Sequence, residues 1–140
     1  MKPAPSLKPT HAAVRAYYDA LAALAAHGAG HEGATETAFS RLLADTAPAV
    51  GRTLIPKQAL KAGGRTIFPD GTLRDLYNLR RGFWEAKDTD DLNAEIQKKI
   101  ARKYPLTNTI FEDTRRAVLF QNRAEARRFD LTELRPPPLQ

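Results

Sequence analysis

Apolar side chains recur every three or four residues in three stretches of the chain, which is the spacing of one helix face. The first stretch runs from Val14 to Ala25, and the third places Leu92, Ile96 and Ile100 on one stripe. Glycines end the first stretch, and a proline ends the second. Three helices are therefore predicted, at residues 11–27, 35–47 and 89–104, with Thr10 capping the first and Thr89 or Asp90 capping the third.

Elsewhere the pattern changes to short runs rich in β-branched and aromatic residues, which is typical of strands. Residues 123–134 are predicted to be a final helix. The resulting order of two helices, three strands, a helix and two strands favours an α/β (mixed α+β) fold with a central mixed sheet flanked by helices. The predicted strands, the first two of which are separated by a Gly-Gly turn, lie at residues 52–60, 65–78, 80–88, 107–114 and 115–122.

A length of 140 residues is typical of one domain, which we expect to span residues 11–132. Three prolines in residues 1–10 predict a flexible N-terminal arm, and residues 133–140 form a proline-rich linker or tail. No apolar run approaches the ~20 residues of a membrane span. We therefore expect a cytoplasmic protein without a membrane partner.

Charge and cysteine content narrow the possible functions. The 22 basic residues outnumber the 16 acidic residues and give a net charge of +6, which favours a polyanionic partner such as nucleic acid. The chain has no cysteine, which excludes disulfides, a thiolate nucleophile and Cys-ligated zinc.

The segment from Phe68 to Leu92 carries the candidate chemistry. On a strand, the side chains of Glu85 and Lys87 leave one face, while Trp84 and Ala86 leave the other and can enter the core. If the strand after Asp70 pairs with this one, Asp70 approaches Glu85. Two carboxylates at close range repel each other unless a cation lies between them, and Mg²⁺ prefers such oxygen ligands. We therefore predict a Mg²⁺ site, with Mn²⁺ as a substitute, that includes the backbone carbonyl of Ala86.

Lys87 is placed to assist hydrolysis beside this ion. Its ammonium group can orient or deprotonate an attacking water, or neutralise charge that develops on phosphorus. A Glu-x-Lys tripeptide is more often a solvated strand face with a weak ion pair, and Pro-Asp-Gly is a common turn. The apolar Gly-Phe-Trp run before Glu85 and the basic helix after it favour the catalytic interpretation.

These residues resemble the PD-(D/E)xK nuclease superfamily, with Asp70 after a proline and Glu85-Ala86-Lys87 as the ExK motif. Residues 84–113 resemble the N-terminal nuclease domains of large restriction–modification polypeptides, including the type ISP group. The resemblance implies a restriction-endonuclease-like core and a Mg²⁺-dependent DNA endonuclease that serves as the cleavage module of a restriction–modification system. It also implies double-stranded DNA as substrate, fused or partner helicase and methyltransferase domains, and a homodimer on cleavage.

The same resemblance implies two further site residues. Glu36 matches an acidic metal ligand on the helix before the sheet, although a Glu in a first helical turn also stabilises the helix dipole. Gln97 matches a catalytic Gln on the helix after ExK, and a plain solvated position is its alternative. The Tyr that some relatives place four residues later is Ala101 here, with Tyr104 as a substitute.

Basic residues flank the acidic motif, as expected of a protein that holds phosphate backbones near its carboxylates. Two other functions stay open: a DNA-binding nuclease-like module that is inactive without its helicase or methyltransferase domains, and a structural or dimerisation domain. The predicted DNA-binding residues are Arg74, Arg81, Lys98, Lys99, Arg102 and Lys103.

Overall fold

The computed structural model describes residues 11–28, 32–87 and 91–132. The predicted arm and the proline-rich tail, residues 1–10 and 133–140, lie outside these ranges. The elements are α1 (Ala12–Ala26), α2 (Glu32–Thr46), the 3₁₀ helix η1 (Ala47–Val50), β1 (Thr53–Pro56), β2 (Leu60–Ala62), β3 (Arg65–Ile67), β4 (Gly71–Arg74), β5 (Arg80–Ala86), α3 (Leu92–Ala101), β6 (Asn108–Glu112), β7 (Arg116–Gln121) and β8 (Ala124–Asp130).

Six strands form one sheet in the order β1-β4-β5-β6-β7-β8, and β2 and β3 form a separate hairpin. β5 and β6 are parallel, and α3 connects them, because parallel neighbours need a crossover. The other neighbours in the sheet are antiparallel. The prediction of a mixed sheet flanked by helices is therefore confirmed.

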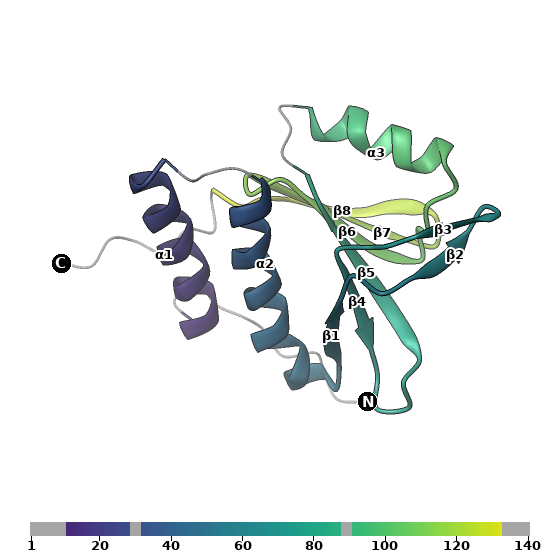
Figure 1. The fold of residues 1–140 in the computed structure, drawn as a ribbon, viewed down its shortest axis with the longest axis horizontal. Helices are drawn as coiled ribbons and strands as arrows, with labels where there is room; N and C mark the ends of the chain where they lie inside the picture. The colour runs from purple at the N-terminus through teal and green to yellow at the C-terminus, as the bar shows by residue number, and fades with distance from the viewer. Residues whose placement is uncertain (1–10, 29–31, 88–90, 133–140) are drawn as a thin grey trace.

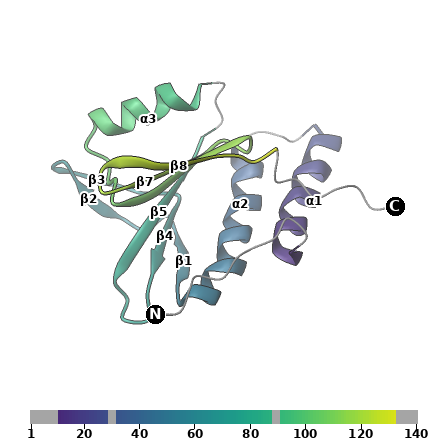
Figure 2. The same ribbon diagram turned by 180° about the vertical axis from the view of Figure 1, so that it is seen from behind.

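The sheet separates two hydrophobic clusters, because successive residues of a strand face opposite sides. Helices α1 and α2 lie side by side and cover one face, while α3 covers the other (Figures 1 and 2). On the first face Trp84 and Ala86 of β5 are buried with 1% and 3% exposure, as predicted. On the second face Leu92 and Ile96 of α3 pack with Phe111 of β6. Residue 85 therefore faces the α3 side.

The helices predicted at residues 11–27, 35–47 and 89–104 are present as α1, α2 and α3, but the caps of α1 and α3 differ from the predicted ones. The imidazole Nδ1 of His11 accepts a hydrogen bond from the Ala13 N–H at 3.1 Å at the start of α1. The carboxylate of Asp91 accepts from the Ala94 N–H at 3.1 Å at the start of α3. The caps predicted from the sequence, Thr10 and Thr89 or Asp90, lie outside the described residues.

The predicted helix at residues 123–134 is wrong, because residues 124–130 form strand β8, which pairs with β7. Asn122 and Arg123 have positive φ angles of 51° and 69°, which suit a tight two-residue hairpin turn. The two long runs at residues 52–60 and 65–78 also divide, each into two strands. The first divides near Lys57, whose φ is 56°.

Gly71 lets β4 approach the core next to the candidate site. A Cβ at this position would lie 2.5 Å from Leu54 Cδ1 and 2.9 Å from Trp84 Cε3, closer than carbon atoms can pack. The glycine therefore fixes the start of β4, and with it the position of Asp70. No helix in the described ranges is long and apolar enough to cross a bilayer.

Candidate active site

Two carboxylates meet where β4 begins and β5 ends. β4 pairs with β5 so that Gly71 lies opposite Trp84, which brings Asp70 beside Glu85. Both residues are buried, with 7% and 6% exposure. The Ala86 N–H donates a hydrogen bond of 2.8 Å to Asp70 Oδ2 and holds this carboxylate against the end of β5. The approach of Asp70 to Glu85 that the strand pairing predicted is present.

The pKa values of the two carboxyl groups are shifted in opposite directions. Burial, and then the hydrogen bond with Asp70, raises the pKa of Glu85 to about 7. Burial opposes ionisation of Asp70 too, but hydrogen bonds from Glu85, Lys57 and the Ala86 N–H lower its pKa overall. Below neutral pH, Asp70 is therefore the ionised member of the pair and Glu85 the protonated one. Buried carboxyls that titrate apart in this way are typical of functional sites.

Lys57 connects Asp70 to the third carboxylate, Glu36 of α2. Its ammonium Nζ lies 2.6 Å from Glu36 Oε1 and also forms an ion pair with Asp70 Oδ1. Although partial burial opposes it, these two bonds raise the pKa of Lys57. Burial, and then the proximity of Asp70, raises the pKa of Glu36 against the opposing effect of Lys57. A pocket of about 270 Å³ opens here, lined by Glu36, Thr37, Ser40, Pro56, Lys57, Asp70 and Trp84.

A second lysine reaches Glu85 from the α3 side. Lys99 Nζ lies 3.4 Å from Glu85 Oε2 and 5.1 Å from the centre of the Tyr104 ring. Tyr104 is buried with 6% exposure, and burial followed by the charge of Glu85 raises its pKa. The sequence assigned Lys99 to DNA binding, whereas its ammonium group contacts a candidate catalytic carboxylate. Tyr104, named only as a substitute, lies beside the motif Glu.

Lys87 follows directly after β5 and is half-buried. Its backbone N–H donates a hydrogen bond of 2.8 Å to the carbonyl of Glu112 on the parallel strand β6. If the alternation of β5 continues one residue past its end, Lys87 leaves the same face as Glu85. The parallel pairing therefore fixes the backbone at the ExK motif.

The other predicted residues are exposed or bind groups other than Asp70 and Glu85. Gln97 is exposed on α3, away from the buried stripe of that helix. Arg74 donates to the Gln58 side chain and the Asn78 carbonyl, at 2.8 Å and 2.6 Å. Two more of the predicted DNA-binding cations have acidic neighbours, Arg81 with Asp75 at 2.7 Å and Lys98 with Glu95 at 3.3 Å. Arg102 and Lys103 are exposed at the end of α3.

The oxygen atoms at this site suit a hard divalent cation. Within the described ranges, no three or more acidic or imidazole side chains form a ready-made metal centre. Mg²⁺ does not require one, because it commonly binds one or two carboxylates and completes its shell with water and substrate phosphate. The close Asp70–Glu85 pair and the raised pKa of Glu85 indicate that a cation between the two carboxylates would stabilise their ionised forms. The donor set therefore fits the predicted ion.

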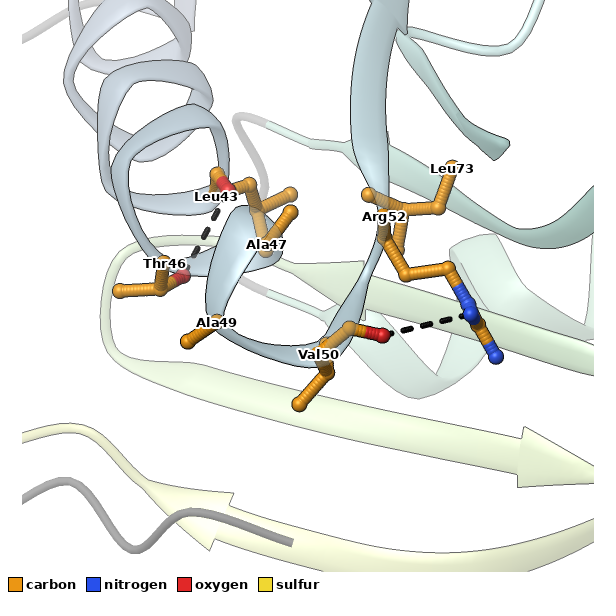
Figure 3. Close-up of a pocket in the computed structure, with 7 residues that line it drawn as sticks. All are labelled: Leu43, Thr46, Ala47, Ala49, Val50, Arg52 and Leu73. Carbon is orange, nitrogen blue, oxygen red and sulfur yellow. Dashed lines mark hydrogen bonds between the residues drawn. The ribbon is translucent and has the colours of Figure 1, made fainter. Parts of the chain in front are cut away.

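Another hollow lies between the end of α2, η1, Arg52 just before β1, and β4 (Figure 3). It has a volume of about 230 Å³, and the Arg52 guanidinium donates to the Val50 carbonyl at its edge, at 3.3 Å. No carboxylate is among the described residues that line it, so we do not place the active site here. These residues are Leu43, Thr46, Ala47, Ala49, Val50, Arg52 and Leu73.

Comparison with solved structures places this fold. The chain is similar to part of a cryo-EM structure of a DrdV–DNA complex, with 42% sequence identity and a TM-score of 0.82 over 87% of this chain. It has a restriction-endonuclease-like fold. The chain spans only 12% of the DrdV chain, so fusion to helicase or methyltransferase parts stays a prediction.

A second structure, a nuclease candidate of the DUF820 group from Anabaena variabilis, has 13% identity and a TM-score of 0.49. The match covers 68% of this chain and 66% of that one. A scan against protein-family models and a search of curated proteins both find no match.

Glu112 is a buried carboxyl on β6 that the predicted motif does not include. It is 1% exposed, and its Oε2 accepts a hydrogen bond of 2.8 Å from the Thr114 N–H. Burial raises its pKa to about 8, above the value of 4.5 expected in the unfolded chain. The folded state therefore binds its proton more tightly, and stability falls as pH rises between these two values.

Glu112→Gln should flatten this decline in stability. We expect the free energy of unfolding, measured by urea titration in EDTA, to fall less steeply between about pH 5.5 and 8, by at most ~1.4 kcal/mol per pH unit. Part of the slope should remain, because the pKa of Glu85 is raised in the same direction. Glu125→Gln, an exposed position on β8, serves as the matched control. An unchanged slope in Glu112→Gln would contradict the assignment.

Proposed function

We propose that this chain is a Mg²⁺-dependent DNA endonuclease domain that hydrolyses phosphodiester bonds as the cleavage module of a restriction–modification system. The observation that carries the proposal is the buried Asp70–Glu85 pair, with Lys87 half-buried two residues after Glu85. The similarity over 87% of the chain to part of a DrdV–DNA complex supports DNA as the substrate.

Asp70, Glu85 and the backbone carbonyl of Ala86 would hold the ion, and Mn²⁺ can replace Mg²⁺. When bound, such an ion stabilises negative charge on a phosphate and makes water a stronger nucleophile. The Ala86 N–H keeps Asp70 in place through Oδ2, and Oδ1 pairs with the Lys57 ammonium. Glu36 on α2 is a third carboxylate, and the Lys57 ammonium bridges it to Asp70.

Lys87, two residues after Glu85, would support the chemistry. Its ammonium group would orient or deprotonate the attacking water, or neutralise charge as the phosphate becomes five-coordinate. The hydrogen bond from its backbone to the Glu112 carbonyl limits movement of the strand end. The burial of Glu85 strengthens electrostatic interactions at this position.

Exposed cations on α3 would bind the phosphate backbone near these carboxylates. Lys98, Arg102 and Lys103 are exposed on or just after this helix. Arg74 and Arg81 bind groups in and around the β4–β5 loop, so we propose that they shape this loop and contact phosphate with their remaining N–H groups. Such contacts are independent of base sequence and weaken as salt rises.

The test is cleavage of supercoiled plasmid by the purified chain. We expect nicked or linear DNA with Mg²⁺ or Mn²⁺ at low salt, and intact DNA with EDTA or with Ca²⁺. Cleavage that persists in EDTA would contradict the proposed dependence on a divalent ion.

A second candidate is a DNA-binding module that cuts only together with further domains. It is favoured by the length of the DrdV chain, of which this chain spans 12%. The expected signature is salt-sensitive DNA binding without cleavage in either Mg²⁺ or Mn²⁺. Cleavage by the isolated chain would exclude this candidate.

A further inference from the structure

Lys57 pairs with the oxygen of Asp70 that does not accept the hydrogen bond from the Ala86 N–H. Asp70 Oδ2 is bound to the Ala86 N–H at 2.8 Å, and Oδ1 forms an ion pair with the Lys57 ammonium. The same ammonium lies 2.6 Å from Glu36 Oε1. A positive charge therefore already lies between Glu36 and Asp70, and Asp70 is one of the two carboxylates that the proposed function assigns to a divalent ion.

We infer that Lys57 is a resident cation that holds this site in the metal-free protein and is displaced when the divalent ion binds. The inference rests on the proposed function, because it names what the proposed ion must replace. An ion on Asp70 Oδ1 would lie within about 5 Å of an ammonium bound to the same oxygen, and the two cations would repel each other. Lys57 therefore competes with the ion and weakens its binding.

Of the two lysines that pair with Asp70 and Glu85, Lys57 is the one that can leave. Its side chain is 56% exposed, so the ammonium can swing into water on its flexible stem. Lys99, which contacts Glu85, is 21% exposed and lies over the Tyr104 ring. The divalent ion should displace the exposed ammonium and leave the packed one in place.

Mn²⁺ titration of the metal-free chain by calorimetry tests this competition. We expect Lys57→Met to bind Mn²⁺ with a Kd about tenfold lower than wild type, equivalent to about 1.4 kcal/mol. Lys57→Arg, which keeps the charge, should stay close to wild type. Lys61→Met removes the same charge from an exposed position on β2 and should change the Kd by less than about twofold. In EDTA, Lys57→Met should have a lower melting temperature than wild type, because Glu36 and Asp70 lose the ammonium that pairs with both of them.

Two outcomes separate failure of the inference from failure of the proposed function. The inference is overturned if Lys57→Met binds Mn²⁺ as tightly as wild type or more weakly. The proposed ion site would then still stand. No Mn²⁺ binding by either protein would overturn the proposed function, and the inference with it.

A measurement on wild type covers the case in which Lys57→Met does not fold. In protein with ¹³C-labelled lysine, Mg²⁺ should shift the Lys57 Cε signal together with the Ala86 amide signal. If the Ala86 amide signal shifts while the Lys57 signal does not, the ion binds without displacing the ammonium. That result would contradict the inference but not the proposed function.

Discussion

Glu85→Gln should lower the rate of divalent-ion-dependent DNA cleavage by a factor on the order of 10³, because a metal ion contributes several kcal/mol of transition-state stabilisation. The substitution should leave the metal-free protein folded. Glu85 has a pKa of about 7, so below neutral pH its metal-free form is mainly the neutral acid that Gln imitates in shape and charge. What the variant lacks is the negative charge that the ion requires. Steady-state cleavage of plasmid DNA and Mn²⁺ calorimetry measure the two effects separately.

The matched control for this prediction is Glu125→Gln, which makes the same change at an exposed position on β8. We expect wild-type cleavage in the control, and unfolding free energies of both variants within about 1 kcal/mol of wild type near pH 6. Undiminished cleavage by Glu85→Gln would remove Glu85 from the site. A variant that binds Mn²⁺ like wild type would remove it from the ligand set.

Lys87→Met should lower the cleavage rate by about 10² to 10⁴-fold, the usual contribution of a positioned proton-transfer group. Lys87 is half-buried and directly follows the end of β5, two residues after Glu85. Its ammonium group is not among the oxygen donors, so removing it should not weaken Mn²⁺ binding. The expected pattern is a large loss of kcat with an unchanged or lower Kd for Mn²⁺. Single-turnover cleavage and calorimetry report these two quantities.

Lys87→Arg distinguishes the two roles proposed for this lysine. Arginine keeps the positive charge but does not give up a proton in proteins. If Lys87 stabilises charge on the phosphate, Lys87→Arg should retain a substantial part of the activity that Lys87→Met loses. If Lys87 accepts a proton from water, both variants should be equally slow. Cleavage by Lys87→Met at the wild-type rate would exclude both roles.

The part of the site that follows from local periodicity could be predicted from the sequence. Trp84 and Ala86 alternate with Glu85, and that alternation indicated which side chains enter the core and which face the chemistry. The pairing of the segment after Asp70 with this strand required only that sequential strands be neighbours, which is the commonest arrangement. The central carboxylate pair was therefore accessible without coordinates.

Lys57 could not be predicted in the same way. Its place beside Asp70 depends on the antiparallel register that sets Pro56 opposite Gly71, and on the turn that follows, where Lys57 has a φ of 56°. Nothing in the local sequence reveals this register. The contact of Lys99 with Glu85 could not be predicted for a related reason. The sequence shows that the helix is basic, but not which of its lysines reaches the motif.

Strand β8 shows where local composition misleads. Its residues from Ala124 to Asp130 include alanine, arginine and glutamate, which favour helices, and all seven are exposed, so no apolar alternation marks a strand. Pairing with β7 and the left-handed turn at Asn122 and Arg123 override that preference. Long-range hydrogen bonding decided this element, and single-sequence patterns do not record it.

The most direct test of the account is a crystal structure of the chain soaked in Mn²⁺, with data collected for anomalous scattering from manganese. We predict an anomalous peak about 2.1 Å from carboxylate oxygens of both Asp70 and Glu85, with the Lys57 ammonium moved away from Asp70. Bound Mn²⁺ with neither carboxylate among its ligands, or an Asp70–Lys57 ion pair left intact beside an unfilled site at saturating Mn²⁺, would contradict it.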